Sequence, residues 1–274
     1  MNQEEYIYVK KKVRELTKFD LEHYASNQMM RRLDSFISRS KTTNITDYFK
    51  LLENDVKELE KLQDFLTIHV SEFFRDAAHF HVLQEKVLPE LLRQNKRLNI
   101  WSAGCSNGSE PYSVAMILEN LAPDMDHRIL ATDIDTDILK KAAAGGPYKP
   151  ADVKNVAQCL GLKYLTFNEG SYWVKEDLRK KVTFRQHDLT RDPFEGAFNL
   201  IMCRNVVIYF SEEAKKKLKE KFYNSLKING VLFIGGTETM LDAAELGFQR
   251  LFACFYRKST DILSKPRTAA VTTR

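Results

Sequence analysis

The stretch that most constrains the fold is 99–113, Asn-Ile-Trp-Ser-Ala-Gly-Cys-Ser-Asn-Gly-Ser-Glu-Pro-Tyr-Ser. It begins with an apolar run typical of a short buried strand, turns between Gly104 and Gly108, and continues from Pro111 with helical apolar spacing. Glycines let the backbone approach a ligand closely, and the start of a helix presents unpaired N–H groups. The spacing is not the dinucleotide-binding Gly-x-Gly-x-x-Gly, and a tight strand-to-helix turn without a ligand would look the same. This stretch alone leaves both interpretations open.

Further apolar runs after this point alternate with helical patterns, which predicts a Rossmann-like α/β domain with a mainly parallel sheet. The predicted strands are 128–135, 182–189, 198–205, 228–236 and a last one within 248–258. Polar residues follow three of them: Asp133, Asp188 and the run Cys203–Asn205. Because ligands bind at the carboxyl ends of parallel strands, we expect these residues and the glycine turn to meet at one edge of the sheet.

Asp133 has two possible roles. At the end of the second strand, its carboxylate could accept hydrogen bonds from both hydroxyls of a ribose. Alternatively, it could cap the helix predicted over 136–144, for which Asp135 is the better candidate.

Residues 4–95 carry helical patterns and almost no glycine or proline. The apolar spacing over 21–37 predicts one helix, which continues to just before Lys41. The spacing over 45–59 predicts another helix, capped within 44–46. On the first of these helices, Arg31 and Arg39 lie on one face, eight positions apart, with Arg32 beside them. This basic face is either solvated or a docking surface for an acidic partner helix.

Composition excludes several classes of protein. The net charge of +5, from 42 basic and 37 acidic residues, is too small to indicate a nucleic-acid partner. The four cysteines form no Cys-x-x-Cys pair, so neither a disulfide framework nor a metal site is expected. The start resembles no signal peptide, and no apolar run reaches membrane length. We therefore expect a cytoplasmic protein.

Four stretches together are similar to the chemotaxis receptor methyltransferase family, the S-adenosylmethionine-dependent protein-glutamate O-methyltransferases. They are Ser71-Glu-Phe-Phe-Arg75-Asp76, 101–113, Ala131-Thr-Asp133-Ile-Asp135 and Cys203-Arg204-Asn205-Val-Val-Ile-Tyr209-Phe210. The resemblance covers residues 5–258. It implies a helical N-terminal receptor-docking domain (1–70) and a methyltransferase domain (71–262) with an inserted β-subdomain (147–181). Within this insertion, two β-prone runs flank Asn168-Glu-Gly170-Ser, which predicts a hairpin. The tail (263–274) is polar and lacks periodicity, so we expect it to be disordered.

The resemblance also implies the residues that contact S-adenosylmethionine and its product S-adenosylhomocysteine. Carried over position by position, they are His69, Ser71, Arg75, Gly104, Glu110, Asp133, Asp188, Leu189, Cys203 and Arg204. The family often has Asn at the positions of His69 and Asp188 and Thr at that of Ser71. Serine keeps the hydroxyl, whereas Asp188 can accept from an adenine amino group but cannot donate to a ring nitrogen.

Arg75 and Tyr209 are the expected catalytic residues. A glutamate carboxylate is ionised at neutral pH and needs no general base, so the site must align it with the donor and exclude water. The forked guanidinium of Arg75 suits a carboxylate, and Tyr209 could close over a sulfonium. The alternatives are an interdomain salt bridge for Arg75 and a core position for Tyr209.

The resemblance names the cytoplasmic helical region of chemotaxis receptors as the partner, with Arg31, Arg32 and Arg39 as docking residues. Neither nucleic acid nor membrane insertion nor a metal is expected, and the chain is expected to be a monomer. Two alternatives remain: a nucleic-acid methyltransferase and a silent regulator that only senses the cofactor. Methylation of a base amino group usually needs an Asn/Asp-Pro-Pro-aromatic motif after the fourth strand, which this chain lacks. Methylation of cytosine C5 needs a cysteine nucleophile, and Cys203 lies at the end of that strand, although a packing role is the better interpretation.

Overall fold

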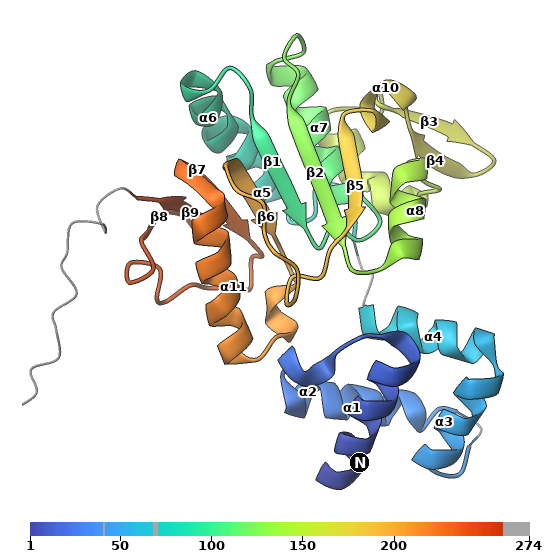
Figure 1. Cartoon of the computed structure of the whole chain (residues 1–274). Helices are drawn as coiled ribbons and strands as arrows, with labels where there is room; N and C mark the ends of the chain where they lie inside the picture. Colours follow the sequence, from blue (N-terminus) through green and yellow to red (C-terminus); the bar gives the residue numbers. More distant parts are fainter. Residues whose placement is uncertain (41, 68–70, 260–274) are drawn as a thin grey trace, which may run out of the picture.

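The computed structural model describes residues 1–40, 42–67 and 71–259, and within them a seven-stranded sheet forms the centre of the molecule (Figure 1). The strand order is β5-β2-β1-β6-β7-β9-β8, parallel from β5 to β7 and antiparallel for β9 and β8. The strands are β1 (Asn99–Ala103), β2 (Arg128–Asp133), β5 (Val182–Gln186), β6 (Phe198–Cys203), β7 (Leu226–Ile234), β8 (Phe248–Phe252) and β9 (Phe255–Lys258). The predicted Rossmann-like α/β class is confirmed.

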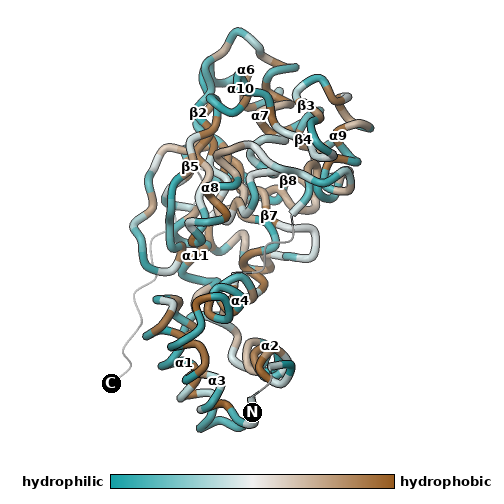
Figure 2. Tube along the Cα trace, turned by 90° about the vertical axis from the view of Figure 1, so that its right-hand side faces the viewer, coloured by the Kyte–Doolittle hydropathy of each residue, from teal (hydrophilic) through white to brown (hydrophobic). Residues whose placement is uncertain are grey.

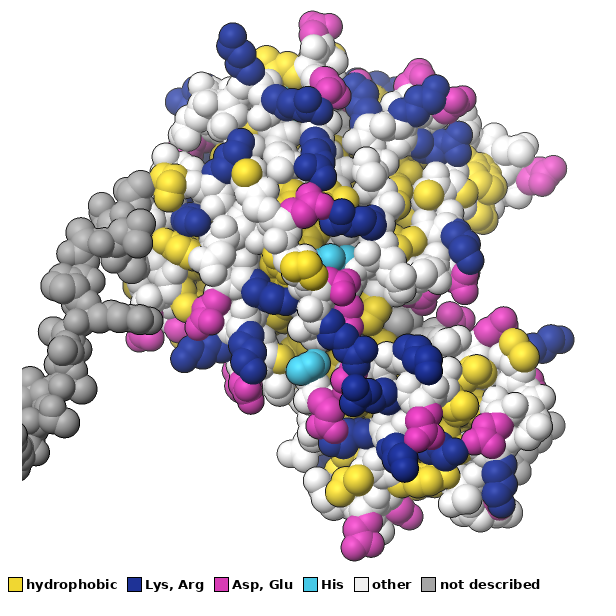
Figure 3. All heavy atoms as spheres, in the orientation of Figure 1, with side chains coloured by type: hydrophobic (Ala, Val, Ile, Leu, Met, Phe, Trp, Pro, Cys, Tyr) yellow, Lys and Arg dark blue, Asp and Glu magenta, His cyan; other side chains and the backbone are white. Residues whose placement is uncertain are grey.

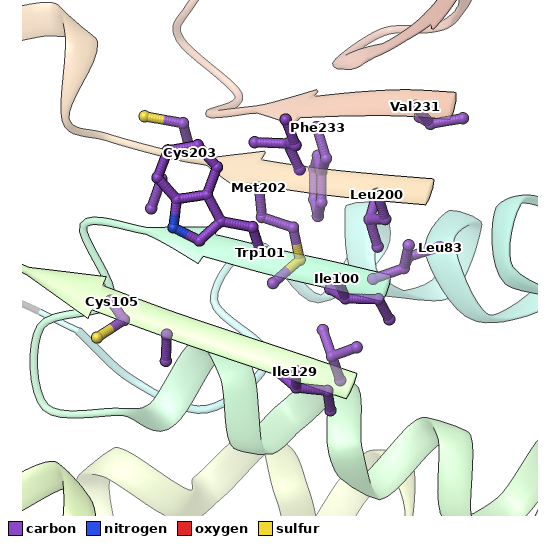
Figure 4. Packing of buried hydrophobic residues seen from close by; sticks show 14 of the residues in the cluster. Leu83, Ile100, Trp101, Cys105, Ile129, Leu200, Met202, Cys203, Val231 and Phe233 are labelled. Carbon is purple, nitrogen blue, oxygen red and sulfur yellow. The ribbon is translucent and has the colours of Figure 1, made fainter. Parts of the chain in front are cut away.

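Strands β1 and β6 lie in the middle of the sheet, and every residue from Ile100 to Ala103 and from Phe198 to Cys203 is buried, as expected for parallel strands covered on both faces. The side chain of Trp101 is buried there and donates a hydrogen bond to Thr132 Oγ1 at 2.9 Å. Figure 4 shows Trp101, Met202 and Cys203 within this core. The helices around the sheet are α5 (Ala77–Val82), the π turn η2 (Leu83–Val87), α6 (Leu88–Gln94), α7 (Ser109–Leu121), α8 (Thr136–Ala144), η4 (Val207–Tyr209) and α11 (Glu212–Ser225).

The N-terminal helices surround a second, separate hydrophobic core that includes Tyr6, Leu33 and Leu62. They are α1 (Gln3–Thr17), η1 (Leu21–His23), α2 (Ser26–Ile37), α3 (Ile45–Asn54) and α4 (Val56–Thr67). The single helix predicted over 21–37 is wrong, because the chain is extended at Tyr24 and pairs there with Phe210. The helix predicted over 45–59 is likewise interrupted at Asp55, whose carboxylate accepts from the N–H groups at the start of α4.

Between β2 and β5 the chain forms a separate two-stranded sheet, and the predicted hairpin is present. Its elements are η3 (Pro150–Val153), α9 (Lys154–Cys159), β3 (Leu165–Asn168), β4 (Ser171–Val174) and α10 (Glu176–Arg179). The last predicted strand, within 248–258, is instead the hairpin β8–β9, because the chain turns at Ala253 and Cys254.

The helical lobe lies at the carboxyl ends of the parallel strands (Figures 1 and 2). Its contact with the sheet domain includes the backbone of the loop after β6: Ala25 N–H donates to the Tyr209 carbonyl at 2.9 Å, and Ser211 N–H donates to the His23 carbonyl at 2.8 Å. Arg191 also pairs with Asp20 at 2.6 Å. In the part of the chain that the structure describes, no helix is long and apolar enough to cross a membrane. The tail expected at 263–274 lies outside the described residues.

Candidate active site

A cavity opens where the carboxyl ends of β1, β2, β5 and β6 face the helical lobe, and it encloses about 1000 Å³ of empty space, its mouth included. Figure 3 shows the notch between the two lobes on one face of the molecule, with charged side chains of both signs along it. Most of the expected site residues line this cavity: Ser71, Arg75, Gly104, Glu110, Asp133, Asp188, Leu189, Arg204 and Tyr209. The polar residues that follow separate strands therefore meet at one edge of the sheet.

The turn after β1 forms one wall of the cavity. Gly104 has a φ of +81°, and a Cβ at this position would lie 2.6 Å from Val206 Cγ2. Only glycine fits both the conformation and the space. The backbone therefore comes close to the loop after β6, and α7 begins directly behind the turn, capped by Gly108 at a φ of +85°.

Asp133 ends β2, and its buried carboxylate anchors this turn. Its Oδ2 accepts from Ser106 N–H at 2.8 Å, and its Oδ1 accepts from Asp135 N–H at 3.2 Å. Asp135, not Asp133, caps α8, accepting from the N–H groups of Asp137 and Ile138. The Asp133 carboxylate also lines the cavity, next to the turn that it holds.

Glu110, in the first turn of α7, faces Arg204 at the end of β6. Glu110 Oε1 accepts from Ser102 Oγ at 2.8 Å, and Oε2 lies 3.4 Å from Arg204 Nη1. Burial raises the pKa of Glu110, while Arg204 and Ser102 oppose that shift. A cationic group entering the cavity would favour the ionised form of Glu110.

Arg204 joins the loop before α5 to the carboxyl end of the sheet. Its guanidinium lies over the rings of Phe80 and Phe233, 5.2 and 4.6 Å from their centres. Nη2 donates to the Arg75 carbonyl at 2.9 Å and to Asp76 Oδ2 at 2.8 Å. Arg204 thereby fixes the backbone that presents Arg75 to the cavity.

Arg75 and Ser71 come from the loop that follows the helical lobe, and Tyr209 comes from η4. Ser71 Oγ lies 2.7 Å from Ser109 Oγ, at the start of α7. Arg75 and Tyr209 are partly buried, and each lines the cavity. Arg75 acts on Glu110 electrostatically, favouring the ionised carboxylate.

Asp188 and Leu189 follow β5 and close the cavity on the side of Asp133. Asp188 Oδ1 accepts from the N–H and the hydroxyl of Thr190, at 2.8 and 2.6 Å. Its N–H donates to Asp192 Oδ2 at 2.8 Å. The side chain is thus fixed by its own loop.

Two expected cofactor residues are not placed in this cavity. Cys203 is completely buried and is absent from the cavity lining, since the strand alternation directs its side chain into the core (Figure 4). Burial also raises the pKa of its thiol well above the ordinary value, so it is unsuited to act as a nucleophile. His69 lies outside the described residues.

The three basic residues expected on one helix face divide into separate groups. Arg31 is exposed on α2, but α2 ends at Ile37, so Arg39 does not lie on the predicted helix face. Arg39 is exposed in the turn that follows, where its Nη2 donates to Ser35 Oγ at 3.1 Å. Arg32 instead turns inward and donates from Nη2 to the Phe65 carbonyl at 2.9 Å. The expectation that Arg32 shares the exposed face is therefore wrong, because α4 supplies its partner.

Several lining residues were not expected from the sequence. Phe19 and Tyr24 come from the helical lobe, and Asn205 follows Arg204. Burial raises the pKa of the Tyr24 hydroxyl, and the carboxylates of Asp188 and Asp133 add to that shift. Asn205 belongs to the Cys203–Phe210 motif, which could have indicated its place in the cavity. No sequence pattern predicts that Phe19 or Tyr24 lines the cavity, because both reach it through the packing of the two lobes.

Family models match both parts of the chain. The model described as the SAM-binding domain of CheR methyltransferases matches residues 69–253, and the all-alpha domain of CheR methyltransferases matches residues 4–67. The chain belongs to the CheR methyltransferase family. As a family member it is a methyltransferase that uses S-adenosylmethionine.

Similar proteins from several bacteria are named chemotaxis protein methyltransferase. The one from Listeria monocytogenes is 38% identical over 258 residues, covering 94% of this chain and 98% of that protein. The one from Borreliella burgdorferi is 36% identical over 226 residues, covering 76% and 78%. The similarity to the Listeria protein therefore extends over both lobes of this CheR methyltransferase.

The cavity fits this cofactor. S-adenosylmethionine carries a ribose, a cationic amino group and a cationic sulfur, and the cavity has the buried carboxylate of Asp133 and the partly buried carboxylate of Glu110 on its wall. Among the residues that the structure describes, no group of three or more His, Cys, Asp or Glu side chains is arranged to hold a metal ion.

Proposed function

We propose that this CheR methyltransferase transfers the methyl group of S-adenosylmethionine to glutamate side chains of chemotaxis receptors, forming methyl esters for sensory adaptation. The observation that carries the proposal is the presence of Arg75 and Tyr209 in the cavity that also contains Glu110 and Asp133. Arginine is the side chain best suited to hold a carboxylate, through paired N–H donors.

We assign the cofactor contacts by chemistry. Asp133 accepts from the ribose hydroxyls, Glu110 from the amino group of the methionine part, and Asp188 from the adenine amino group. Ser71, Gly104, Leu189 and Arg204 complete the binding surface, Arg204 by holding Glu110 and the Arg75 backbone. S-adenosylmethionine supplies a methyl group that is already electrophilic because it is bonded to a sulfonium.

The protein residues then have little proton chemistry to perform. The acceptor glutamate is ionised at neutral pH, so no general base is needed. Arg75 orients the carboxylate, and Tyr209 closes the cavity and faces the sulfonium with its electron-rich ring. Phe19, Tyr24 and Phe210 supply apolar surface that helps to exclude water.

We propose that the helical domain, residues 1–70, docks the cytoplasmic helical region of the receptor, and that residues 71–262 carry out the transfer. Arg31 and Arg39 provide the exposed basic face, and Arg32 supports it from within. The receptor helices carry the acceptor carboxylates, so a basic surface beside the cavity steers them by charge. The protein then acts as a cytoplasmic monomer, without nucleic acid and without entering the membrane.

The experiment is incubation with methyl-labelled S-adenosylmethionine and either a receptor cytoplasmic fragment or nucleic acid. We expect label on the receptor that base releases, because carboxyl methyl esters hydrolyse in base. Stable label on nucleic acid, or cofactor binding with no transfer to the receptor, would contradict the proposal.

A further inference from the structure

The loop that carries Tyr209, residues 204–210, is held by a carboxylate from another segment. Glu238 follows β7 after the turn at Gly235 and Gly236. Its Oε2 accepts from Gly235 N–H at 2.5 Å and from Asn205 N–H at 3.2 Å, and its Oε1 accepts from Ile208 N–H at 3.2 Å. One side chain thus connects the end of β7 to two points of the loop.

This loop has N–H groups that its own short helix does not satisfy. Asn205 has a φ of +58°, a left-handed backbone conformation that asparagine adopts more readily than most residues other than glycine. The helix η4 that follows contains three residues, and the first N–H groups of any helix lack partners within it. The conformation therefore depends on acceptors supplied from outside the loop.

The space around the Glu238 carboxylate is closely filled. A Cβ on Gly235 would lie 2.7 Å from Glu238 Oε2 and 2.9 Å from Asn205 N. The Glu238 carboxyl is partly buried; its desolvation raises its pKa, while its three N–H donors and the charge of Arg204 favour the ionised form. Glu238 is not among the described residues that line the cavity, so it acts only through the loop.

On its opposite side the loop is bonded to the helical lobe, through Ala25 N–H to the Tyr209 carbonyl. We propose that Glu238 is a positioning residue: its carboxylate fixes the 204–210 loop so that Tyr209 faces the methyl-transfer site. This inference rests on the proposed role of Tyr209.

The test compares Glu238→Gln with the wild-type protein. Glutamine has the same shape, but in either orientation its amide nitrogen would face an N–H donor that the carboxylate now accepts. The matched control is Glu90→Gln, since Glu90 is also partly buried and bonded, to Arg257 Nη2 at 2.6 Å. Glu90 lies on α6, which Figure 1 shows away from the helical lobe. Glu238→Asp keeps the negative charge but shortens the side chain by one methylene group. This variant replaces Glu238→Gln in the test if the glutamine variant does not fold.

Amide hydrogen exchange and kinetics are measured on the same samples. We expect exchange in the 204–210 peptide to be at least roughly tenfold faster in Glu238→Gln, kcat to fall at least about tenfold and the cofactor Kd to change less than about threefold. For Glu238→Asp, the exchange rate in 204–210 and kcat should lie between those of Glu238→Gln and the wild type. For Glu90→Gln, both quantities should equal those of the wild type. Unchanged exchange in 204–210, or a kcat loss equal to the loss of folded protein, would overturn the inference. Hydrogen exchange can be measured without turnover. A wild-type protein that does not methylate the receptor would therefore contradict the proposed function, while the exchange rates would still test whether Glu238 fixes the 204–210 loop.

Discussion

The guanidinium of Arg32 lies over the ring of Tyr209, 5.7 Å from its centre, and over the ring of Phe65 at 4.9 Å. Arg32 belongs to α2, whose exposed side carries Arg31, with Arg39 exposed in the turn just after the helix ends. The same helix therefore contacts a residue of the cavity on one side and presents the exposed basic side chain of Arg31 on the other. In the proposed function, this places receptor docking and the methyl-transfer site on two faces of one element.

Asp133→Ala should weaken cofactor binding at least roughly tenfold, because a carboxylate that accepts charged or multiple hydrogen bonds contributes about 1.5–3 kcal/mol. Isothermal calorimetry measures the effect. Asp137→Ala is the control, since Asp137 is exposed on α8 and pairs with Lys140, three residues along the same helix, at 2.6 Å. An affinity equal to that of the control would remove Asp133 from the binding surface.

Cofactor affinity should fall as the pH decreases through the raised pKa of Glu110. Desolvation raises that pKa, so Glu110 becomes protonated, and loses its attraction for the amino cation, at a higher pH than an ordinary glutamate. The loss approaches roughly tenfold per pH unit below the pKa. Glu110→Gln should bind weakly with little pH dependence, whereas Glu119→Gln, on the same helix but outside the cavity lining, should titrate like the wild type. Parallel titration curves for Glu110→Gln and the wild type would contradict this role.

Arg75→Ala should lower the methylation rate at saturating cofactor and receptor by at least roughly tenfold, since an acceptor carboxylate that is not oriented reacts slowly. The substitution keeps the Arg75 carbonyl that Arg204 bonds, so the site should stay assembled. Receptor binding, measured by sedimentation, should survive. A saturated rate equal to that of Arg93→Ala, a change at an exposed residue of α6, would show that Arg75 does not act on the acceptor.

Arg31→Glu combined with Arg39→Glu should weaken receptor binding and make the remaining binding less sensitive to salt, because an attractive charged surface is reversed. The matched control is Arg93→Glu with Arg97→Glu, which changes the net charge equally at exposed positions next to the amino end of β1. If both double variants bind the receptor alike, the basic surface at Arg31 and Arg39 is only solvated.

The parts of the fold that depend on local sequence were predictable. Asn44 and Asp135 cap helices as expected, and α8 spans the predicted residues, because a cap needs only the next few N–H groups. The break at Tyr24 was not predictable, since the extended backbone there is stabilised by Phe210 from the other lobe.

The same distinction holds for the site. The glycine turn and the strand-end residues, such as Asp133 and Asp188, were found because parallel strands bring their carboxyl ends to one edge. The inward turn of Arg32 and the bonds of Glu238 to the Tyr209 loop depend on residues far away in the chain. No local pattern contains these contacts.

The most direct test of the central claim is the position of the transferred methyl group. Receptor cytoplasmic fragment is incubated with the wild-type protein and S-adenosylmethionine, digested, and sequenced by tandem mass spectrometry, with Arg75→Ala as the control reaction. We expect methyl groups on glutamate side chains of the receptor helices, accumulating much more slowly with Arg75→Ala. Methyl groups on lysine, arginine or nucleic acid, or an unmodified receptor despite bound cofactor, would contradict the claim.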